Sequence, residues 1–493
     1  MENMFNLVDE PWIPVASRGL VSLTDIFSDP TLPTIGGNPV QKIAVMKLLF
    51  AISQTAFTPN DEDEWRHKGA NDLATECLNY LKNHHRKFYL FGDNPFLQMP
   101  AIQSAKKKNY GALLPEVSTG NTTILSHIQT SNSFKNSDKA LLLVTLMSMS
   151  LGGKKTDNSI NLTPGYEKSK SAKPGPGVSF KGLLHSFPEC DTLQGSIWLN
   201  TFSHEQIDNS GLYPGGLGKA PWEQMPTGEA CSVAQKLKET LIGRLIPLSR
   251  FCLLALNDLH YSEGILHPTY KDGAFDPTVA ANTAGKEIKV MWVNPDKRPW
   301  RELTGLLSFL GRGYGSSFQS LQLRVGVERA RSLGANFSIW SGGLSVSFNA
   351  GEQYVTGTDD YVESRILFDS NALGESWFAQ LKIEMEGLDQ LARVLFGAIL
   401  KYNQEQMSDG GGKAAFGVNR FWLLCEAHFQ HLVDACVQRD DAAGDRKGLR
   451  KSFAAINQQI YNESCPNLTA RQLDAWAKYR PNNYSYLSSG GER

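Results

Sequence analysis

The chain has 493 residues, of which 41% are hydrophobic and 20% are charged, and its formal net charge is −1. These values are typical of a globular protein of two or three domains, and they exclude a free-standing nucleic-acid binder that relies on a strongly basic surface. Any contact with nucleic acid must therefore come from local loops or from a site shared with partner subunits.

The cysteines and the N-terminus indicate the cellular compartment. Seven cysteines are scattered without a C-x-x-C pair, which argues against a disulfide framework and a zinc module. The N-terminal "MENMFNLVDEPWIPV" lacks the basic and apolar regions of a signal peptide, and no run of 18 apolar residues is present. The sequence predicts a cytoplasmic protein without a membrane partner.

The N-terminal part mixes short strands and helices. "FNLVDEPWIPV" (5–15) predicts an edge strand that ends at prolines. "VQKIAVMKLLFAISQTAF" (40–57) repeats apolar residues at helical spacing and predicts an amphipathic helix on the core. "KFYLFGDNPFLQMP" (87–100) predicts an aromatic strand followed by a turn.

An apolar run, "DKALLLVTLMSMSL" (138–151), ends at Gly152-Gly153 and is followed by Lys154-Lys155. From there to Gly177 the composition predicts a long exposed loop, and such loops are usually functional or disordered. The glycines would let backbone approach a ligand, and the lysines would neutralise phosphates. An ordinary solvated turn fits the same residues, and Lys173 with its Gly-Pro-Gly corner is open to the same two interpretations.

Strand-like stretches follow this loop. They are "GSIWLNTF" (195–202), "RFCLLALN" (250–257), "EIKVMWVNP" (287–295) and the hairpin "GGLSVSFNAGEQYVTG" (342–357). Arg250 lies inside an apolar strand, where an arginine either flanks the core or inserts into a minor groove. At the hairpin tip, Asn349 and Gln353 offer amides that could bond base edges or wedge a duplex, although amides are also common turn residues.

The character of the chain changes near Ser370, after which four segments carry apolar residues at helical spacing. They are 379–407, 420–438, 448–465 and 469–480. Four such helices with short connections predict an antiparallel bundle. The predicted fold class is α+β: a large mixed α/β domain with short sheets at 1–370, followed by a C-terminal antiparallel four-helix bundle at 371–493.

No catalytic constellation stands out. "SDGGGKA" around Lys413 lacks the first glycine and the Ser/Thr of a phosphate-binding loop and reads as a helix connector. Asp359 and Asp360 could bind a metal, but paired acids in a turn are also solvated or cap a helix. The sequence does not read as an enzyme. A metal-dependent nuclease or nucleotide hydrolase using Asp359 and Asp360 is the alternative hypothesis, and a scaffold without DNA contacts is a third.

Taken together, the segments resemble the CasA family, the large subunit of the type I-E CRISPR Cascade surveillance complex. The matching stretches, in order along the chain, are "NLVDEPWIPV", "EWRHKG", "FYLFGDNPFLQ", "STGNTTILSH", "SLGGKK", "GSIWLNTF" and "WSGGLSVSFNAGEQYVTGTDDYVES". Each motif is modest alone, whereas the ordered set is specific.

The resemblance implies a protein without catalytic activity that docks on the guide-RNA complex and inspects double-stranded DNA for the protospacer-adjacent motif. It implies that the subunit then helps to open the duplex, so that guide pairing reads the target and an R-loop forms. The family works from the minor groove, which distinguishes little beyond A·T from G·C. It also implies partners: the other Cascade subunits with guide RNA, and a helicase-nuclease that degrades the target.

Carried over residue by residue, the resemblance implies a set of DNA contacts. The glycine loop corresponds to Gly152-Gly153 with the adjacent Lys154 and Lys155, the basic finger to Arg250, and the glutamine wedge to Gln353 with Asn349 beside it. The loop 122–135, including Ser126 and His127, would contact the guide complex. No zinc and no other cofactor are expected, because the cysteine pairs of some relatives are missing here.

The resemblance also implies that the C-terminal bundle touches another Cascade subunit and the displaced DNA strand. Candidate strand contacts are Arg446, Lys447, Arg450 and Lys451. A solvated helix face is the alternative interpretation, because neighbouring aspartates dilute the positive field.

Overall fold

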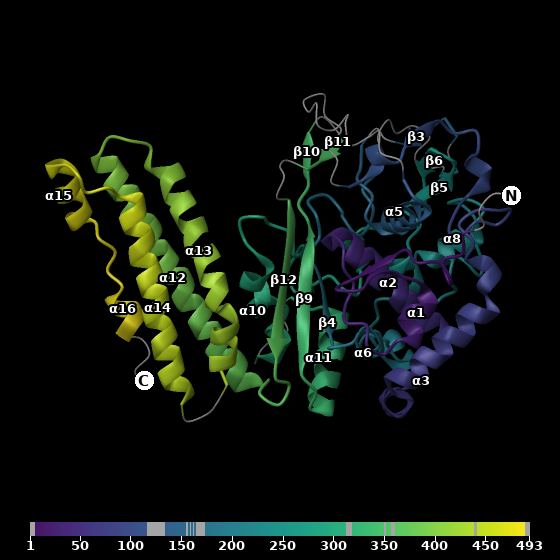
Figure 1. Ribbon diagram of the computed structural model, residues 1–493, viewed down its shortest axis with the longest axis horizontal. Helices are drawn as coiled ribbons and strands as arrows, with labels where there is room; N and C mark the ends of the chain where they lie inside the picture. The colour runs from purple at the N-terminus through teal and green to yellow at the C-terminus, as the bar shows by residue number, and fades with distance from the viewer. Residues whose placement is uncertain are drawn as a thin grey trace. The chain divides into compact units, whose positions relative to one another are not determined.

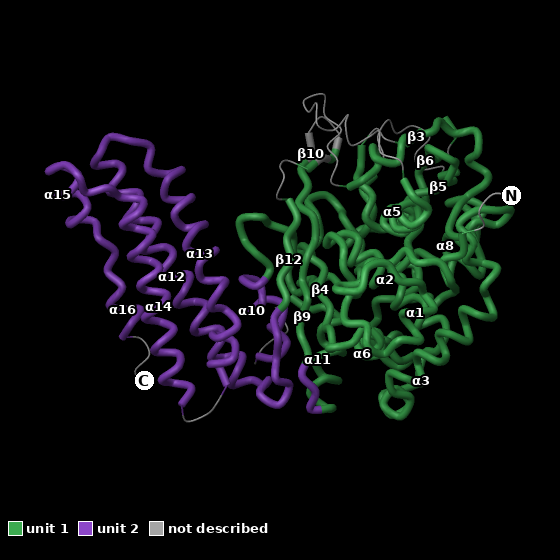
Figure 2. Tube along the Cα trace, viewed as in Figure 1, with its two compact units in different colours: residues 1–299, 316–333, 337–365 green, residues 300–315, 334–336, 366–493 purple. Residues whose placement is uncertain are grey.

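The computed structural model describes residues 5–115, 134–153, 156–157, 159–160, 162–163, 173–311, 318–349, 352–355, 360–437 and 441–488. The chain forms two compact units (Figure 2). Unit 1 comprises 1–299, 316–333 and 337–365, and unit 2 comprises 300–315, 334–336 and 366–493. The predicted mixed α+β class is confirmed: unit 1 holds small sheets and helices, whereas long helices dominate unit 2 (Figure 1).

A buried helix, α2 (Pro39–Ala56), forms the centre of unit 1 (Figure 1). Asn38 caps its start by accepting a hydrogen bond from the Gln41 N–H, and Pro39 supplies a preset first turn. The predicted amphipathic character is wrong, because α2 is buried on nearly every side. Its two lysines are buried in ion pairs, Lys42 with Glu189 at 2.8 Å and Lys47 with Asp276 at 2.5 Å.

The chain contains further helices and short 3-10 turns before unit 2's long helices. The helices are α1 (Leu23–Ser28), α3 (Glu62–Asn83), α5 (Asn136–Ser148), α6 (Leu193–Leu199), α7 (His204–Asn209), α8 (Ser232–Leu237), α9 (Leu241–Leu245) and α11 (Leu321–Leu333). The 3-10 turns are His85–Lys87, Pro100–Ile102, Gly111–Leu113, Tyr270–Asp272, Pro299–Glu302 and Ser308–Leu310, the last two belonging to or bordering unit 2. Because α2, α3, α5, α6 and α9 pack on one another, they bury a single apolar core.

Two three-stranded sheets lie against these helices. One has the order β12 (Tyr361–Phe368), β9 (Phe337–Leu344), β4 (His185–Glu189), and the other the order β3 (Lys107–Asn109), β6 (Asp258–Glu263), β5 (Arg250–Leu254). Three antiparallel pairs add β1 (Ile13–Val15) with β2 (Gly19–Val21), β7 (Ala281–Asn282) with β8 (Lys289–Val290), and β10 (Ser347–Asn349) with β11 (Glu352–Tyr354). Within the second sheet, Arg250 stands opposite Glu263.

The predicted strand at 195–202 is wrong, because most of this stretch is helix α6. Thr192 begins the helix by accepting a hydrogen bond from the Gly195 N–H. Trp198 then stacks on Trp65 of α3 at a ring separation of 4.3 Å. A short apolar run can be strand or buried helix, and here the cap and the packing decide for helix.

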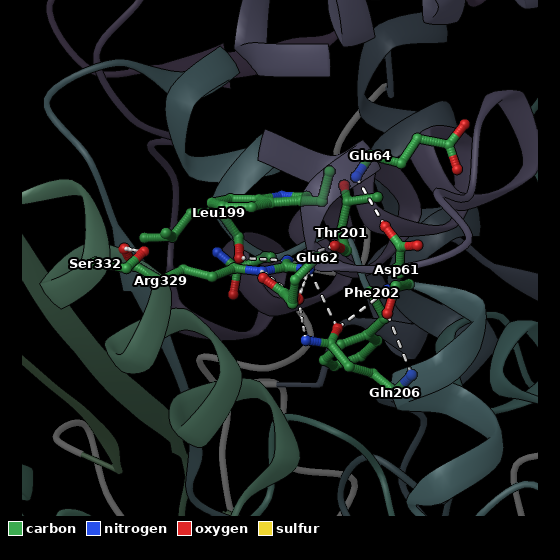
Figure 3. A network of polar contacts seen from close by, with 12 residues as sticks. Asp61, Glu62, Glu64, Leu199, Thr201, Phe202, Gln206, Arg329 and Ser332 are labelled. Atoms are coloured by element: carbon green, nitrogen blue, oxygen red, sulfur yellow. Dashed lines mark hydrogen bonds and ion pairs between the residues drawn. The ribbon is translucent and has the colours of Figure 1, made fainter. Parts of the chain in front are cut away.

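A network of charged and polar contacts joins α3, the α6–α7 segment and α11 (Figure 3). The Arg329 guanidinium is buried and donates hydrogen bonds to both Glu62 carboxylate oxygens. It also donates to the Thr201 carbonyl at 2.5 Å and lies 4.0 Å above the Trp65 ring. Charge-assisted bonds of this kind fix the geometry between elements that are distant in sequence.

Unit 2 contains three long helices, α12 (Glu375–Glu405), α13 (Gly410–Ala435) and α14 (Ala442–Ser464), each in contact with the other two. The predicted fourth helix, 469–480, is α15 (Ala470–Lys478), which packs on α12, and a further short helix, α16 (Tyr484–Ser488), packs on α12 and α14. Pro481 separates them, since proline cannot continue a helix. A short helix, α10 (Leu303–Leu306), packs on α12.

The cysteines are free thiols, five of them buried and two half-buried. Burial raises the pKa of Cys190 and of Cys252 to about 12, so these thiols carry no thiolate character near neutral pH. In the described part of the chain, no helix has the length and apolar character needed to cross a membrane.

Candidate nucleic-acid interface

The glycine pair lies where the buried helix α5 gives way to a loop. Residues 136–148 form α5, and Leu151, Gly152 and Gly153 that follow remain buried. Gly153 has a φ of +114°, a backbone conformation that residues with a Cβ rarely adopt. The second glycine is therefore required by the path of the chain itself.

The hairpin of β10 and β11 contributes Gln353, whose side chain is fully buried. Its Oε1 accepts a hydrogen bond from the Gly152 N–H at 2.8 Å. Its Nε2 donates to the carbonyls of Ser179 at 2.7 Å and Phe180 at 3.3 Å. One glutamine amide thus ties the glycine loop to the segment after the Gly-Pro-Gly corner.

Arg250, at the start of β5, is 1% exposed and contacts the same loop. Its Nη2 donates to the Leu151 carbonyl at 2.9 Å and to the Lys173 carbonyl at 2.5 Å. Its Nη1 forms an ion pair with Oε2 of the buried Glu263 carboxylate at 3.4 Å, and its Nε donates to the Tyr261 hydroxyl. Arg250 therefore bonds two loop segments, one at Leu151 and one at Lys173.

The residues after the lysine pair are anchored to β6. The Thr156 hydroxyl donates to Glu263 Oε1 at 3.0 Å, and the Asp157 N–H donates to the Tyr261 carbonyl at 3.0 Å. The Asp157 carboxylate also accepts from the Lys106 N–H at 2.7 Å. The chain is therefore fixed at Gly152 on one side of the lysine pair and at Thr156 on the other.

The Gly-Pro-Gly corner packs directly on the end of α5. The Gly175 N–H donates to the Ser150 carbonyl at 2.7 Å, and the Gly177 N–H donates to the Ser148 carbonyl at 2.9 Å. A Cβ on Gly175 would lie 2.5 Å from the Ser148 carbonyl oxygen. These glycines serve close backbone packing between the two loops.

The structure thus brings three of the predicted DNA-contact residues together, namely Gly152, Gln353 and Arg250. Both side chains are buried here, so they act in this form by holding the loops, and their direct contact with DNA stays a prediction. Asn349 ends β10, and its side chain lies outside the described residues. Also outside them are Lys154, Lys155, Ser126 and His127.

Asp360, proposed in the alternative hypothesis as a metal ligand, is 7% exposed, and its carbonyl accepts from the Ser345 N–H. Asp359 lies outside the described residues. Within the described ranges, no group of three or more His, Cys, Asp or Glu side chains is arranged to hold a metal ion. No observation here favours the nuclease hypothesis.

The four basic candidates of unit 2 divide into two classes. Arg450 is buried and donates to both carboxylate oxygens of Glu384, at 2.8 and 2.6 Å. Arg446 is half-buried and donates to the Ala435 carbonyl at 2.7 Å. Lys447 and Lys451 are exposed on α14. Two of the four therefore serve the packing of the bundle, and two are available to a partner.

The acidic residues that form ion pairs with the buried arginines were not predicted from the sequence. Glu263 is the cross-strand neighbour of Arg250, and Glu384 is the partner of Arg450. Glu384 interrupts the apolar face of α12 between Leu381 and Met385, which is the one signal that a buried cation was needed there.

Comparison with known proteins identifies a family and structural relatives. The family model described as CRISPR-associated protein Cse1 matches residues 6–460. A CasA/Cse1 protein of Thermus thermophilus is 30% identical over 145 residues, which cover 26% of this chain and 28% of that relative. This match spans less than a third of the relative's length.

Solved structures share the fold along nearly the whole chain. The crystal structure of Thermobifida fusca Cse1 matches with a TM-score of 0.77 and 18% identity, covering 98% of each chain. A chain of a CRISPR RNA-guided surveillance complex matches with a TM-score of 0.67 and 14% identity, covering 97% of this chain and 99% of that one.

Proposed function

The chain belongs to the CRISPR-associated protein Cse1 (CasA) family, and we propose that it is the non-catalytic large subunit of a type I-E Cascade complex. In this role it recognises the protospacer-adjacent motif of double-stranded DNA from the minor groove and promotes duplex opening and R-loop formation. Its partners are the other Cascade subunits with their guide RNA, the target DNA and a helicase-nuclease that it helps to recruit. The likeness to one chain of an RNA-guided surveillance complex supports the other Cascade subunits as partners.

One observation carries the proposal. The glycine loop and the hairpin glutamine, which the family resemblance makes a minor-groove loop and a duplex wedge, are joined by a hydrogen bond although 201 residues separate them. Arg250, the third residue of the resemblance, bonds the carbonyl of the residue before Gly152. Three elements that are distant in sequence thus lie together at one site in unit 1.

The site has the chemistry that such a sensor needs. Glycine backbone without Cβ atoms can enter a narrow groove, and lysines beside it can bind the flanking phosphates. Rigid anchoring on both sides of the lysine pair gives those contacts a fixed register. The duplex is then opened by guide pairing, so the protein itself reads only the short motif.

The test is target binding by a guide complex assembled with and without this subunit. Duplexes would carry the matched target with a functional motif, with a scrambled motif, or with the motif and a mismatched target. The proposal predicts motif-dependent binding only when the subunit is present. Motif discrimination that is the same without the subunit would contradict it.

A further inference from the structure

A cavity of about 240 Å³ lies beneath the 173–180 segment of unit 1. Ser179 and Phe180, whose carbonyls hold Gln353, form part of its wall. Most of the wall is apolar and includes Leu183, Tyr270, Phe275, Val279 and Val290. The proposed function assigns no role to this space.

Arg244, from helix α9, and Arg250 are buried cations of this wall, and Arg244 is 8% exposed. Its Nη2 donates to the Lys238 carbonyl at 2.6 Å, and its Nη1 lies 3.4 Å from His267 Nδ1. Its Nε is buried without a hydrogen-bond partner. Of the carboxylates in the described residues, none lies within 4.0 Å of this guanidinium.

The neighbouring charges do not neutralise Arg244. The Asp276 carboxylate in the wall is bonded to Lys47 at 2.5 Å, and Arg250 faces Glu263. Burial lowers the pKa of His267 to about 3, so this ring is neutral near pH 7. The cavity therefore holds one buried positive charge more than it holds negative charges, and such an uncompensated charge is costly unless an anion accompanies it.

We propose that this cavity binds a small organic oxyanion, a carboxylate or phosphate on an apolar body, with Arg244 as its principal ligand. A guanidinium presents parallel N–H donors that match the two oxygens of such a group. The apolar wall takes the body of the ligand, which is the usual division of labour in a small-molecule site. The proposal does not depend on the function proposed above.

The experiment uses the purified full chain and two pairs of probes, each an organic anion and a neutral compound with the same apolar body. Benzoate is compared with benzamide, and deoxyadenosine monophosphate with deoxyadenosine, by isothermal titration calorimetry and ligand-observed NMR. The first pair tests a carboxylate ligand and the second a phosphate, and inorganic phosphate tests the bare oxyanion. At least one anionic probe should bind about tenfold or more tightly than its neutral counterpart, since charge-assisted hydrogen bonds are about twice as strong as neutral ones.

Arg244→Gln should abolish that preference, whereas Arg324→Gln, a change at an exposed arginine of α11, should preserve it. Equal binding of charged and neutral probes, or an unchanged preference in Arg244→Gln, would overturn the proposal. Inorganic phosphate that binds as tightly as the organic anions would also overturn it, because the apolar wall would then contribute nothing. Should Arg244→Gln fail to fold, the paired probes on the unmodified chain still decide.

Discussion

The Gln353 side chain accepts a hydrogen bond from the Gly152 backbone N–H at 2.8 Å, inside a site where Gln353 is fully buried. The same amide donates to the Ser179 and Phe180 carbonyls, so one side chain holds two loops. These hydrogen bonds, called here the Gln353 latch, fix the positions of the loops that we propose to read DNA.

Gln353→Ala should lower the free energy of unfolding by about 1–3 kcal/mol, because it leaves a buried N–H and buried carbonyls without partners. Hydrogen exchange at the Gly152 amide should accelerate, while exchange in α2 stays slow. Gln103→Ala, at an exposed glutamine, is the matched control. An unchanged Gly152 amide in the Gln353 variant would contradict the latch.

Arg250→Met should be more damaging, because it leaves the buried Glu263 carboxylate without its cation. Breaking a buried ion pair in this way lowers the free energy of unfolding by about 3–5 kcal/mol. Urea unfolding of the variant would measure this loss. The double variant Arg250→Met/Glu263→Gln should recover part of the loss. If Arg250→Met lowered the free energy of unfolding no more than Arg324→Met at an exposed position, the buried ion pair would not stabilise the fold.

Gly175→Ala tests the close packing of the Gly-Pro-Gly corner on α5. Its Cβ would lie 2.5 Å from the Ser148 carbonyl oxygen, and overpacking of this kind costs about 1–3 kcal/mol. Gly285→Ala is the control, since its Cβ would meet nothing closer than 3.5 Å. Equal melting temperatures for the two variants would show that the Gly-Pro-Gly corner accommodates the added Cβ without loss of stability.

Acid should destabilise unit 1 in a window set by His267. Burial lowers the pKa of His267 to about 3 in the folded chain, while the unfolded ring titrates near 6.5. Between these values only the unfolded chain takes up the proton, so stability falls as the pH drops, by up to about 1.4 kcal/mol per pH unit. This loss should begin below about pH 6.5.

His267→Gln should reduce this slope between about pH 6 and 4, and His204→Gln, at an exposed histidine, should leave it unchanged. Below about pH 4 a second loss remains, because the pKa of Asp276 is lowered to about 2. Burial opposes that shift, and the Lys47 charge overcomes it. An identical slope in the His267 variant would contradict this assignment.

The basic candidates of α14 should separate in function. Lys447→Glu/Lys451→Glu should weaken binding of the displaced single strand and reduce its salt dependence, with stability changed by less than about 0.5 kcal/mol. Arg450→Met should instead destabilise unit 2, because Glu384 loses its buried partner. Strand binding that is insensitive to both lysines would leave this face of α14 without a nucleic-acid role.

The long periodic segments of unit 2 could be predicted from the sequence, since 379–407 and 448–465 fall largely within α12 and α14. Short apolar runs could not, and 195–202 became helix through its cap and its tryptophan stack. Gly152 and Gln353 were recognisable as unusual residues, but their contact depends on tertiary folding across 201 residues. The burial of Arg250 followed from Glu263 opposite it, a strand register that periodicity does not reveal.

The most direct test of the sensor is the motif discrimination ratio of the assembled guide complex, the affinity for a target with the motif divided by that for a target without it. Complexes would carry the unmodified subunit, Gln353→Ala, Lys154→Ala/Lys155→Ala, or Lys286→Ala as an exposed control. We predict that the Gln353 and double-lysine variants assemble normally and lose most of the discrimination, while Lys286→Ala keeps it. Full discrimination in both site variants would contradict the account.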